Sequence, residues 1–254
     1  MISVVFLGFG NVNSHLFDAL VRNSKASVLQ VFNRNRTAIN FKSKNISFTT
    51  DITSIVDADI YIIGIPDDAI SAFSESLVFQ NKLVVHTSGG ASIGVLSSKN
   101  RRGVFYPLQT FSKKRNLDFK EIPICIEAEN DLDLQLLRQL GETISENVVA
   151  ISSEKRAKLH LAAVFVNNFV NHLYYVGAEI LQTEKLPFNL LKPLIAETAA
   201  KIEALSPQEA QTGPAKRNDI KTVEKHLNLL DEKRHKEIYE LFTKELNQKY
   251  GKEL

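Results

Sequence analysis

The sequence has 254 residues, which at roughly 100 to 200 residues per domain predicts two domains. Hydrophobic residues make up 44% of the chain and charged residues 24%, a composition that excludes a disordered protein and favours a soluble globular one. Lys and Arg number 31 against 29 Asp and Glu, a balance too even to predict a surface that binds nucleic acid or a membrane.

The single cysteine, Cys125, cannot form an internal disulfide, so a reducing cytoplasm is the expected compartment. The same scarcity of thiols argues against a clustered thiolate site, and we predict no bound metal. The longest candidate apolar run, residues 159–166, contains His160. It is shorter than the roughly 18 apolar residues of a membrane span, so none is predicted.

Short apolar runs recur through the first 151 residues and have the length of buried strands. They cover residues 3–7, 28–32, 60–65, 83–86, 103–106, 122–126 and 148–151. Most are separated by helix-length segments such as 13–22 and 131–142. This alternation predicts an α/β fold with a doubly wound, mainly parallel sheet covered by helices.

The pattern changes after Ile151, where strand-like runs end and helical periodicity takes over. Four helices are predicted, and the loop of residues 206–214 is the most irregular stretch between them. They cover residues 154–181, 187–205, 218–230 and 232–250. The sequence therefore predicts a doubly wound α/β domain over residues 1–151 and an all-helical domain over 152–254.

A glycine turn follows the first predicted strand. Gly8 permits a tight turn, and Gly10 lets a pyrophosphate approach the backbone of Asn11 and Val12 at the start of the next helix. Asn13 stands where the dinucleotide fingerprint has its third glycine, so we expect helix and strand to lie slightly further apart. The alternative is a glycine turn that binds no ligand.

The second strand ends in residues that differ from those of an NAD site. An NAD site usually presents Asp or Glu to the ribose at this position. Here Asn33 is available for the ribose, and Arg34, Arg36 and Thr37 offer donors to a 2′-phosphate, so NADP is the predicted cofactor. The alternative is a loop of solvated charges.

The next strand, residues 60–65, ends in Ile65 and Pro66. At the carboxyl edge of the sheet these two residues are predicted to form a backbone wall beside the cofactor ribose. Asp67 and Asp68 follow, and capping of the next helix is the favoured interpretation over a catalytic role.

Hydroxyl groups and a glycine follow the strand of residues 83–86. Thr87, Ser88 and Gly89 come directly after His86. Thr87 is predicted to contact the cofactor, and Ser88 and Gly89 to hold the carbonyl or carboxylate of a substrate. Capping of a following helix by Thr87 or Ser88 is an equally good interpretation.

Two further segments offer polar side chains. Gln109 and Thr110 follow a strand and a rigid proline turn, and either line the cleft or only build the turn. Thr212 lies in a Gly-Pro loop that either touches the substrate or leads to capping of the next helix by Asn218 or Asp219.

A polar line crosses the long predicted helix. His160, Asn167 and Asn171 are spaced i, i+7 and i+11, with Arg156 one turn earlier, which in an α-helix places them within a narrow arc. The surrounding residues are apolar, so burial is expected, and the amides need partners or a wet cleft. His160 is the best-placed proton donor and Asn167 would orient the substrate, with Asn171 beside it. A satisfied core histidine is the alternative.

Taken together, these motifs resemble those of a family of NADP oxidoreductases in which a Rossmann-like domain precedes an uncharacterised helical domain. The motifs are Gly8-x-Gly10, Asn33-Arg34, Ile65-Pro66-Asp67-Asp68, His86-Thr87-Ser88-Gly89, Pro107-Leu108-Gln109-Thr110-Phe111, the helix from His160 to Asn168, and Thr212-Gly213-Pro214. More distantly the chain resembles the 6-phosphogluconate dehydrogenase-like superfamily, with pyrroline-5-carboxylate reductase, prephenate dehydrogenase and deazaflavin-dependent NADP reductase. The resemblance implies a catalytic cleft between the domains and dimerisation through helices.

Several positions depart from what the resemblance implies. The triplet Ser88-Gly89-Gly90 follows the fifth strand, whereas the β-hydroxyacid dehydrogenases carry a similar triplet after the sixth. Relatives among the β-hydroxyacid dehydrogenases carry a catalytic lysine three residues before the first of two asparagines, where this chain has Val164 before Asn167. Their mechanism therefore does not transfer to this chain. Relatives often show His before the Pro-Leu-Gln turn, where this chain has Tyr106.

The sequence thus predicts an NADP-dependent oxidoreductase that transfers a hydride between nicotinamide and a carbonyl or imine of a small polar metabolite. The alternative is a non-catalytic NADP-binding sensor or interaction protein. A homodimer through the C-terminal helices is predicted as well, because the long helix is apolar around most of its circumference and few other helices are available to cover it.

Overall fold

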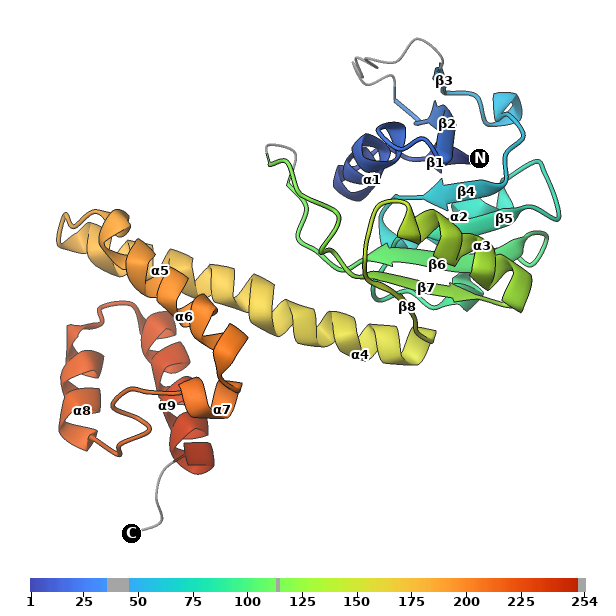
Figure 1. The fold of residues 1–254 in the computed structure, drawn as a ribbon. Coiled ribbons are helices and arrows are strands. Elements are labelled where there is room, and N and C mark those ends of the chain that lie inside the picture. Colours follow the sequence, from blue (N-terminus) through green and yellow to red (C-terminus); the bar gives the residue numbers. More distant parts are fainter. Residues whose placement is uncertain (36–45, 113–114, 251–254) are drawn as a thin grey trace. The chain divides into compact units, whose positions relative to one another are not determined.

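The computed structural model describes residues 1–35, 46–112 and 115–250 (Figure 1). The chain divides into two compact units, Met1–Asn167 and Asn168–Leu254. The first contains the sheet and the first half of a long helix, and the second contains the remaining helices.

Within the described residues, eight strands form one sheet in the order β3-β2-β1-β4-β5-β6-β7-β8. Neighbouring strands are parallel except for β6 and β7, which pair antiparallel. The strands are β1 Ile2–Leu7, β2 Ala26–Phe32, β3 Ser47–Thr49, β4 Ile60–Ile63, β5 Leu83–His86, β6 Arg101–Pro107, β7 Ile124–Ala128 and β8 Val148–Ala150.

Helices cover both faces of the sheet. Successive strand side chains point to opposite faces, so Val4 and Phe6 of β1 pack in one core with α1 (Asn11–Val21) and α3 (Asp131–Glu142). Val5 and Leu7 pack in a second core with α2 (Asp67–Glu75). Two short 3₁₀ helices, η1 (Ile52–Ser54) and η2 (Ile93–Val95), lie in the connections.

The predicted fold class is confirmed, with two differences in detail. The three-residue strand β3 was not predicted, because its segment is too short to show periodicity. The parallel pattern also breaks between β6 and β7. Parallel neighbours need a crossover of a dozen or more residues, usually a helix, and among the described residues of the connection between β6 and β7 none is helical.

Asn13 occupies the position of the third fingerprint glycine and is completely buried. Its Nδ2 donates hydrogen bonds to the carbonyl oxygens of Gly8 (2.8 Å) and Ile62 (3.1 Å). A Cβ added to Gly64 would overlap the Asn13 amide group. The missing side chain of Gly64 thus provides the room that a glycine at position 13 would otherwise provide.

Replacing Gly64 with Ala is therefore expected to lower the free energy of unfolding by roughly 1 to 3 kcal/mol, the range for overpacked cores. Urea denaturation measures this change. Gly94→Ala is the matched control, because its new Cβ would come no closer than 3.5 Å to Ser92 Oγ. Equal stability of both variants would contradict the packing of Asn13 against Gly64.

The long predicted helix is present but is not α-helical throughout. α4 (Ser153–Ala163) runs into a π-helical segment, Val164–Phe169, which runs into α5 (Val170–Thr183). A π-turn closes i→i+5 hydrogen bonds and so shifts the helical phase. The α-helical spacing from which one narrow polar arc was predicted does not hold across this segment, and the arc itself stays a prediction.

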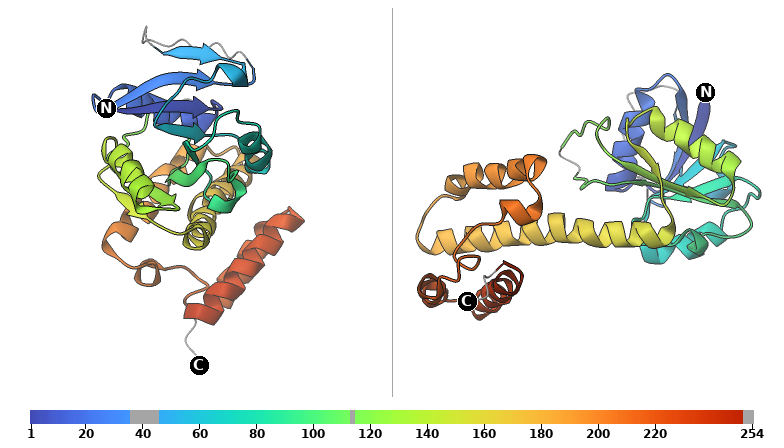
Figure 2. Two further views of the ribbon diagram at one scale, coloured as in Figure 1. Left: turned by 90° about the vertical axis from the view of Figure 1, so that its right-hand side faces the viewer. Right: turned by 60° about the horizontal axis from the view of Figure 1, so that its bottom comes forward.

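The second unit contains no strand among its described residues (Figure 2). The irregular loop of residues 206–214 includes a short helix with a capping box, Ser206 with Glu209, and Asp219 caps α8 as one of the two predicted candidates. Its elements after α5 are a 3₁₀ helix, η4 (Phe188–Leu191), α6 (Lys192–Ala204), α7 (Pro207–Ala210), α8 (Ile220–Leu229) and α9 (Lys233–Tyr250).

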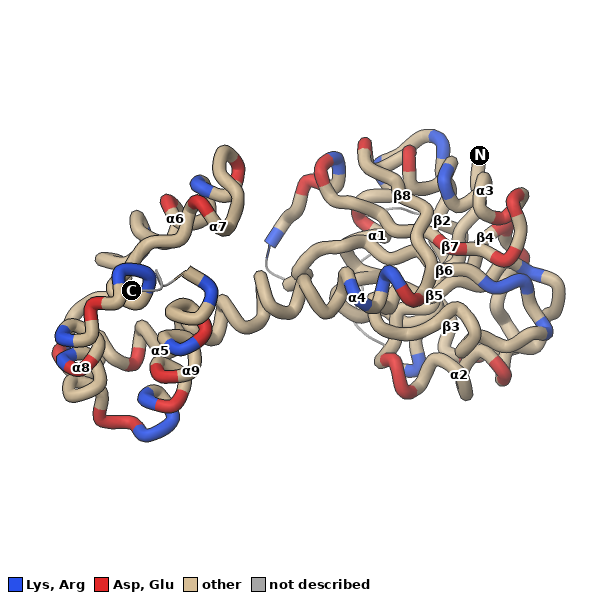
Figure 3. Tube along the Cα trace, turned by 90° about the horizontal axis from the view of Figure 1, so that it is seen from below, with Lys and Arg blue, Asp and Glu red and all other residues tan. Residues whose placement is uncertain are grey.

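Charged residues of both signs are interspersed over the sheet unit and the C-terminal helices (Figure 3). Residues 159–178 of the long helix carry no Lys, Arg, Asp or Glu, which appears as an uncharged stretch of tube in Figure 3. Among the described residues, no helix is both long and apolar enough to cross a membrane.

Candidate active site

The turn from β1 to α1 forms a backbone cradle. Gly8 has a φ of +85°, in the region that L side chains rarely adopt. A Cβ at Gly8 would lie 2.9 Å from the carbonyl oxygen of Gly64 and would overlap Ile65 Cγ2. The backbone conformation at position 8 and the space around it therefore both require glycine.

The N-terminus of α1 is open to an anion. Gly10 is the N-cap residue, no side chain caps the helix, and its first turn has no acidic residue. Backbone N–H groups at such an end are unsatisfied and the helix dipole favours negative charge. Asn11 is exposed and donates from Nδ2 to the carbonyl oxygen of Phe111 (3.3 Å), while Val12 is half-buried.

This turn lies where the strand order reverses. β1 is flanked by β2 on one side and β4 on the other, and open α/β sheets bind ligands in the crevice at such a switch point. Ile65 follows β4 and packs against Gly8, and Pro66 is the N-cap residue of α2. The predicted capping by Asp67 and Asp68 is wrong, because they fall in the first turn of α2.

The end of β2 carries the residues predicted to select NADP. Asn33 is half-buried, and its Nδ2 donates to the carbonyl oxygen of Asn35 (2.9 Å). Arg34 is exposed. Arg36 and Thr37 lie outside the described residues.

After β5 the chain makes a tight turn held by Ser88. The Ser88 hydroxyl donates to Asp67 Oδ2 (2.7 Å) and accepts from the N–H groups of Gly90 (3.1 Å) and Ala91 (2.9 Å). Thr87 Oγ1 donates to the carbonyl oxygen of Ile63 (3.3 Å). The alternative prediction that Thr87 or Ser88 caps a following helix is wrong, since Ser92 is the N-cap residue of η2.

His86 is completely buried, and both of its ring nitrogens have partners. Nδ1 accepts from the N–H of Ser88 (3.2 Å), and Nε2 lies 3.2 Å from the carbonyl oxygen of Ser92. Burial, assisted by the charge of Arg156, lowers the pKa of His86 to about 4. His86 is therefore neutral at pH 7 and supports the turn after β5.

Tyr106 and His160 form a pair that the sequence did not predict. The Tyr106 hydroxyl lies 3.2 Å from His160 Nδ1, and the two rings meet edge to face. Gly89 packs over both, since a Cβ added there would be 2.7 Å from His160 Nδ1 and 2.8 Å from Tyr106 Cζ. β6, α4 and the turn after β5 thus meet at one point.

A buried ion pair fixes α4 one turn before His160. Arg156 is completely buried and pairs with Glu127 of β7, and it also donates to the carbonyl oxygen of Ala91. Ser153 donates through its hydroxyl to Glu127 (2.7 Å) and accepts from the N–H of Ile93 (2.9 Å). The sequence placed Arg156 on the polar line but gave no signal for Glu127, which is distant along the chain.

Other predicted site residues are exposed. Asn167 and Asn171 are exposed in the single chain, so the burial expected for them is not found there, and Gln109 is exposed as well. Thr212 lies in the second unit and lines an apolar cavity of about 260 Å³ between α5, α9 and the loop of residues 212–215.

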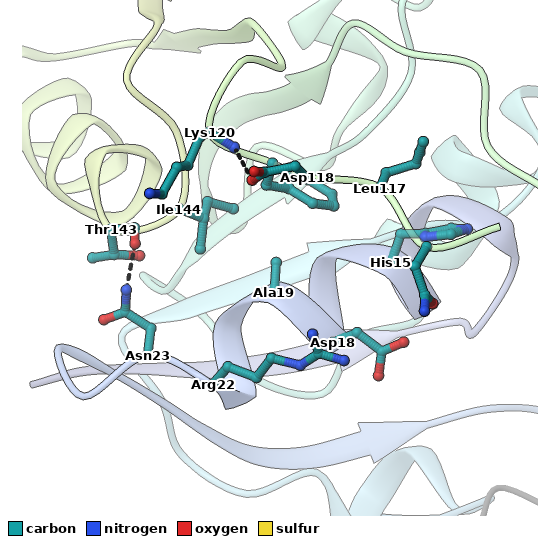
Figure 4. A pocket seen from close by; sticks show the side chains of 12 residues that line it. His15, Asp18, Ala19, Arg22, Asn23, Leu117, Asp118, Lys120, Thr143 and Ile144 are labelled. Atoms are coloured by element: carbon teal, nitrogen blue, oxygen red, sulfur yellow. Dashed lines mark hydrogen bonds between the residues drawn. The ribbon is translucent and has the colours of Figure 1, made fainter.

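A cavity of about 340 Å³ lies between the second half of α1, the end of α3 and residues 116–120 (Figure 4). Its polar lining includes Asp18, Arg22, Asp118 and Lys120, and Figure 4 shows them around its rim. None of the predicted site residues lines this cavity.

A glycine cradle at the switch point of a mainly parallel sheet, followed by helices, defines a Rossmann-like α/β protein with a helical C-terminal domain. Comparison with known proteins then gives the family. The solved structure of the "putative NADP oxidoreductase BF3122" from Bacteroides fragilis is 38% identical with a TM-score of 0.88, covering 97% of this chain and 98% of that one. The chain belongs to the same family as that protein, which confirms the resemblance predicted from the motifs.

More distant comparisons agree with the fold. Protein TM1727 from Thermotoga maritima is 23% identical with a TM-score of 0.73, covering 96% of this chain and 97% of that one. The 1-pyrroline-5-carboxylate reductase of Streptococcus pyogenes is 13% identical with a TM-score of 0.63, covering 98% of both chains. A family model described as a domain of unknown function, DUF2520, matches residues 122–246. A comparison with curated proteins gave no match.

Proposed function

We propose that the protein is an NADPH-dependent oxidoreductase that reduces a carbonyl or imine of a small polar metabolite. The observation that carries this proposal is the backbone cradle of the β1–α1 turn, where a side chain at Gly8 has no room and the helix end at Gly10 carries no cap. The Bacteroides fragilis relative is described as a "putative NADP oxidoreductase", which supports the same assignment.

The cradle fits a dinucleotide. Gly8, Gly10 and the N–H groups at Asn11 and Val12 would hold the pyrophosphate. Asn33 would bind the adenosine ribose and Arg34 the 2′-phosphate, with Arg36 as a predicted second cation. Ile65, Pro66 and Thr87 would line the wall beside the nicotinamide ribose. The bound cofactor supplies the hydride, and the chain's own residues supply positioning and the proton.

His160 is the proposed proton donor, because it lies beside Gly89 and Tyr106 at the same edge of the sheet as Thr87. The turn of Ser88 and Gly89 would position the polar end of the substrate. The Ser88 hydroxyl already bonds Asp67, Gly90 and Ala91, so its contribution would come through the shape of this turn. The roles of Asn167, Asn171, Gln109 and Thr212 toward the substrate stay predictions, as does a cleft between the domains.

The cofactor assignment is tested by calorimetric titration with NADPH and NADH. Arg34→Ala is expected to weaken NADPH binding by about 1.5 to 3 kcal/mol, the value of a hydrogen bond to a charged group, and to leave NADH binding unchanged. Arg22→Ala is the matched control, because Arg22 is an exposed cation at the end of α1, beyond the cradle. Tighter binding of NADH than of NADPH would contradict the assignment.

The competing function is a non-catalytic NADP sensor. Oxidation of NADPH is measured across a panel of keto acids, aldehydes, cyclic imines and flavins, with the wild type and with His160→Gln. A reductase oxidises NADPH with at least one member of the panel and loses most of that rate in His160→Gln. Tight binding of NADPH with every compound inert and no effect of His160→Gln would favour the sensor.

A further inference from the structure

The surroundings of the Tyr106–His160 pair favour one direction of hydrogen bonding. Among the described residues, His160 Nδ1 is the one hydrogen-bond partner of the Tyr106 hydroxyl, at 3.2 Å. Tyr106 is 9% exposed. If Nδ1 carried a proton and donated it to the phenol oxygen, the phenol proton would have no acceptor among the described residues, and an unpaired polar group on a largely buried side chain is costly. The favoured arrangement has the hydroxyl donating to Nδ1.

The phenol remains a donor over the whole physiological pH range. Burial raises the pKa of Tyr106 to about 12, and the charge of the nearby Arg156 opposes this shift without cancelling it. A neutral imidazole that accepts at Nδ1 carries its proton on Nε2. Gly89 closes the Nδ1 side of the ring, since a Cβ there would be 2.7 Å from that nitrogen.

We infer that Tyr106 holds His160 as the neutral tautomer with its proton on Nε2, and that Tyr106 replaces this proton when the substrate takes it. This inference rests on the proposed function only for its catalytic consequence. Tyr106 is a positioning residue, because it acts through His160 and does not itself touch the substrate.

The proton balance of the step is complete. When the carbonyl carbon of the substrate gains a hydride from the reduced nicotinamide, its oxygen takes the proton from Nε2. The Tyr106 hydroxyl proton moves to Nδ1 at the same time, which leaves a phenolate. After the product leaves, the proton on Nδ1 returns to the phenolate and Nε2 takes a proton from water, which restores the resting tautomer. An alkoxide is a much stronger base than a phenolate, so the transfer runs toward the substrate. A neutral Nε2–H needs an acceptor lone pair, which a carbonyl oxygen has and a protonated imine lacks. The carbonyl is therefore the inferred substrate class.

The tautomer is measured by long-range proton–nitrogen NMR correlation on protein labelled with ¹⁵N at its six histidines, in the absence of cofactor. The signals that disappear from the spectrum of His160→Gln are those of His160. The expected result is an Nε2–H pattern in the wild type that is lost in Tyr106→Phe, which keeps the ring and removes the hydroxyl. Gly89→Ala is expected to disturb the same signals by displacing the His160 ring.

A second Tyr–His pair in this chain supplies the control. Tyr239 lies with its hydroxyl 2.8 Å from His226 Nδ1 and the two rings meet edge to face. Tyr239→Phe should change the signals of His226 and leave those of His160 unchanged. An Nδ1–H pattern for His160 in the wild type, or an unchanged pattern in Tyr106→Phe, would overturn the inference.

Kinetics provide the second readout. Tyr106→Phe is expected to lower kcat for a ketone or aldehyde by at least about tenfold and by no more than the roughly 10²–10⁴-fold that general acid catalysis contributes, while the Kd of NADPH stays unchanged. An unchanged kcat would overturn the proton-replacing role. If the protein reduces nothing on the panel, the proposed function fails, while the NMR result still decides the tautomer.

Discussion

Glu127→Ala is expected to lower the free energy of unfolding by about 3 to 5 kcal/mol, because it leaves the charge of Arg156 buried without a carboxylate to balance it. Arg156 has no exposed side-chain surface, and Glu127 is the carboxylate that pairs with it. The same carboxylate accepts hydrogen bonds from the N–H of Ser153 (2.9 Å) and from its hydroxyl (2.7 Å). Removing the carboxylate therefore also removes the hydrogen bonds that hold Ser153 at the start of α4. Urea denaturation measures the change.

Glu129→Ala is the control for this prediction, because Glu129 pairs with Arg102 at the surface, where both side chains keep contact with water. Such pairs contribute at most about 1 kcal/mol. Replacing both buried partners, as in Glu127→Leu combined with Arg156→Met, should recover much of the loss, since no charge remains buried. A loss for Glu127→Ala as small as that for Glu129→Ala would show that the ion pair is solvated.

Val166→Asp is expected to convert a homodimer into a monomer. We propose the dimer because the uncharged part of the long helix exposes many large apolar side chains, and faces of this kind are normally buried against a partner. Val166 is 74% exposed. The other large apolar side chains exposed on this stretch are Leu161, Phe165, Phe169, Leu173, Tyr174 and Tyr175. A charge placed in such an interface is desolvated without compensation. Phe169→Asp should act in the same way.

Light scattering decides the oligomeric state at micromolar concentration. The wild type is expected at twice the 28.5 kDa mass of the chain and Val166→Asp at that mass. Leu132→Asp is the matched control, because Leu132 is 78% exposed on α3 and lies outside this stretch, so the variant should stay dimeric. A wild type that scatters as a monomer would contradict the proposal.

Local features of the fold were predictable from the sequence, because each depends on residues close together in the chain. The apolar runs gave the main strands, and Gly8 with Gly10 gave the turn between β1 and α1. The accommodation of Asn13 was not predictable, since it depends on the absence of a side chain at Gly64, far along the chain.

The candidate site was predicted only in part for the same reason. His160 was singled out from its place on an apolar helix, whereas its contact with Tyr106 joins residues 54 positions apart. The π-helical segment Val164–Phe169 was not predicted, because its four apolar residues and two asparagines are compatible with either an α-helical or a π-helical period. The polar arc predicted through Asn167 and Asn171 assumed an α-helical period, which does not hold at that segment.

The central claim is that this chain transfers a hydride, and isotope transfer tests it most directly. NADPH carrying deuterium at C4 of the nicotinamide is incubated with the protein and with each keto acid, aldehyde and cyclic imine of the panel. Mass spectrometry then detects deuterium in the reduced product. The account predicts one deuterium on the former carbonyl or imine carbon of at least one product, and its near-complete loss in His160→Gln. NADPH that binds tightly while no compound gains deuterium would contradict it.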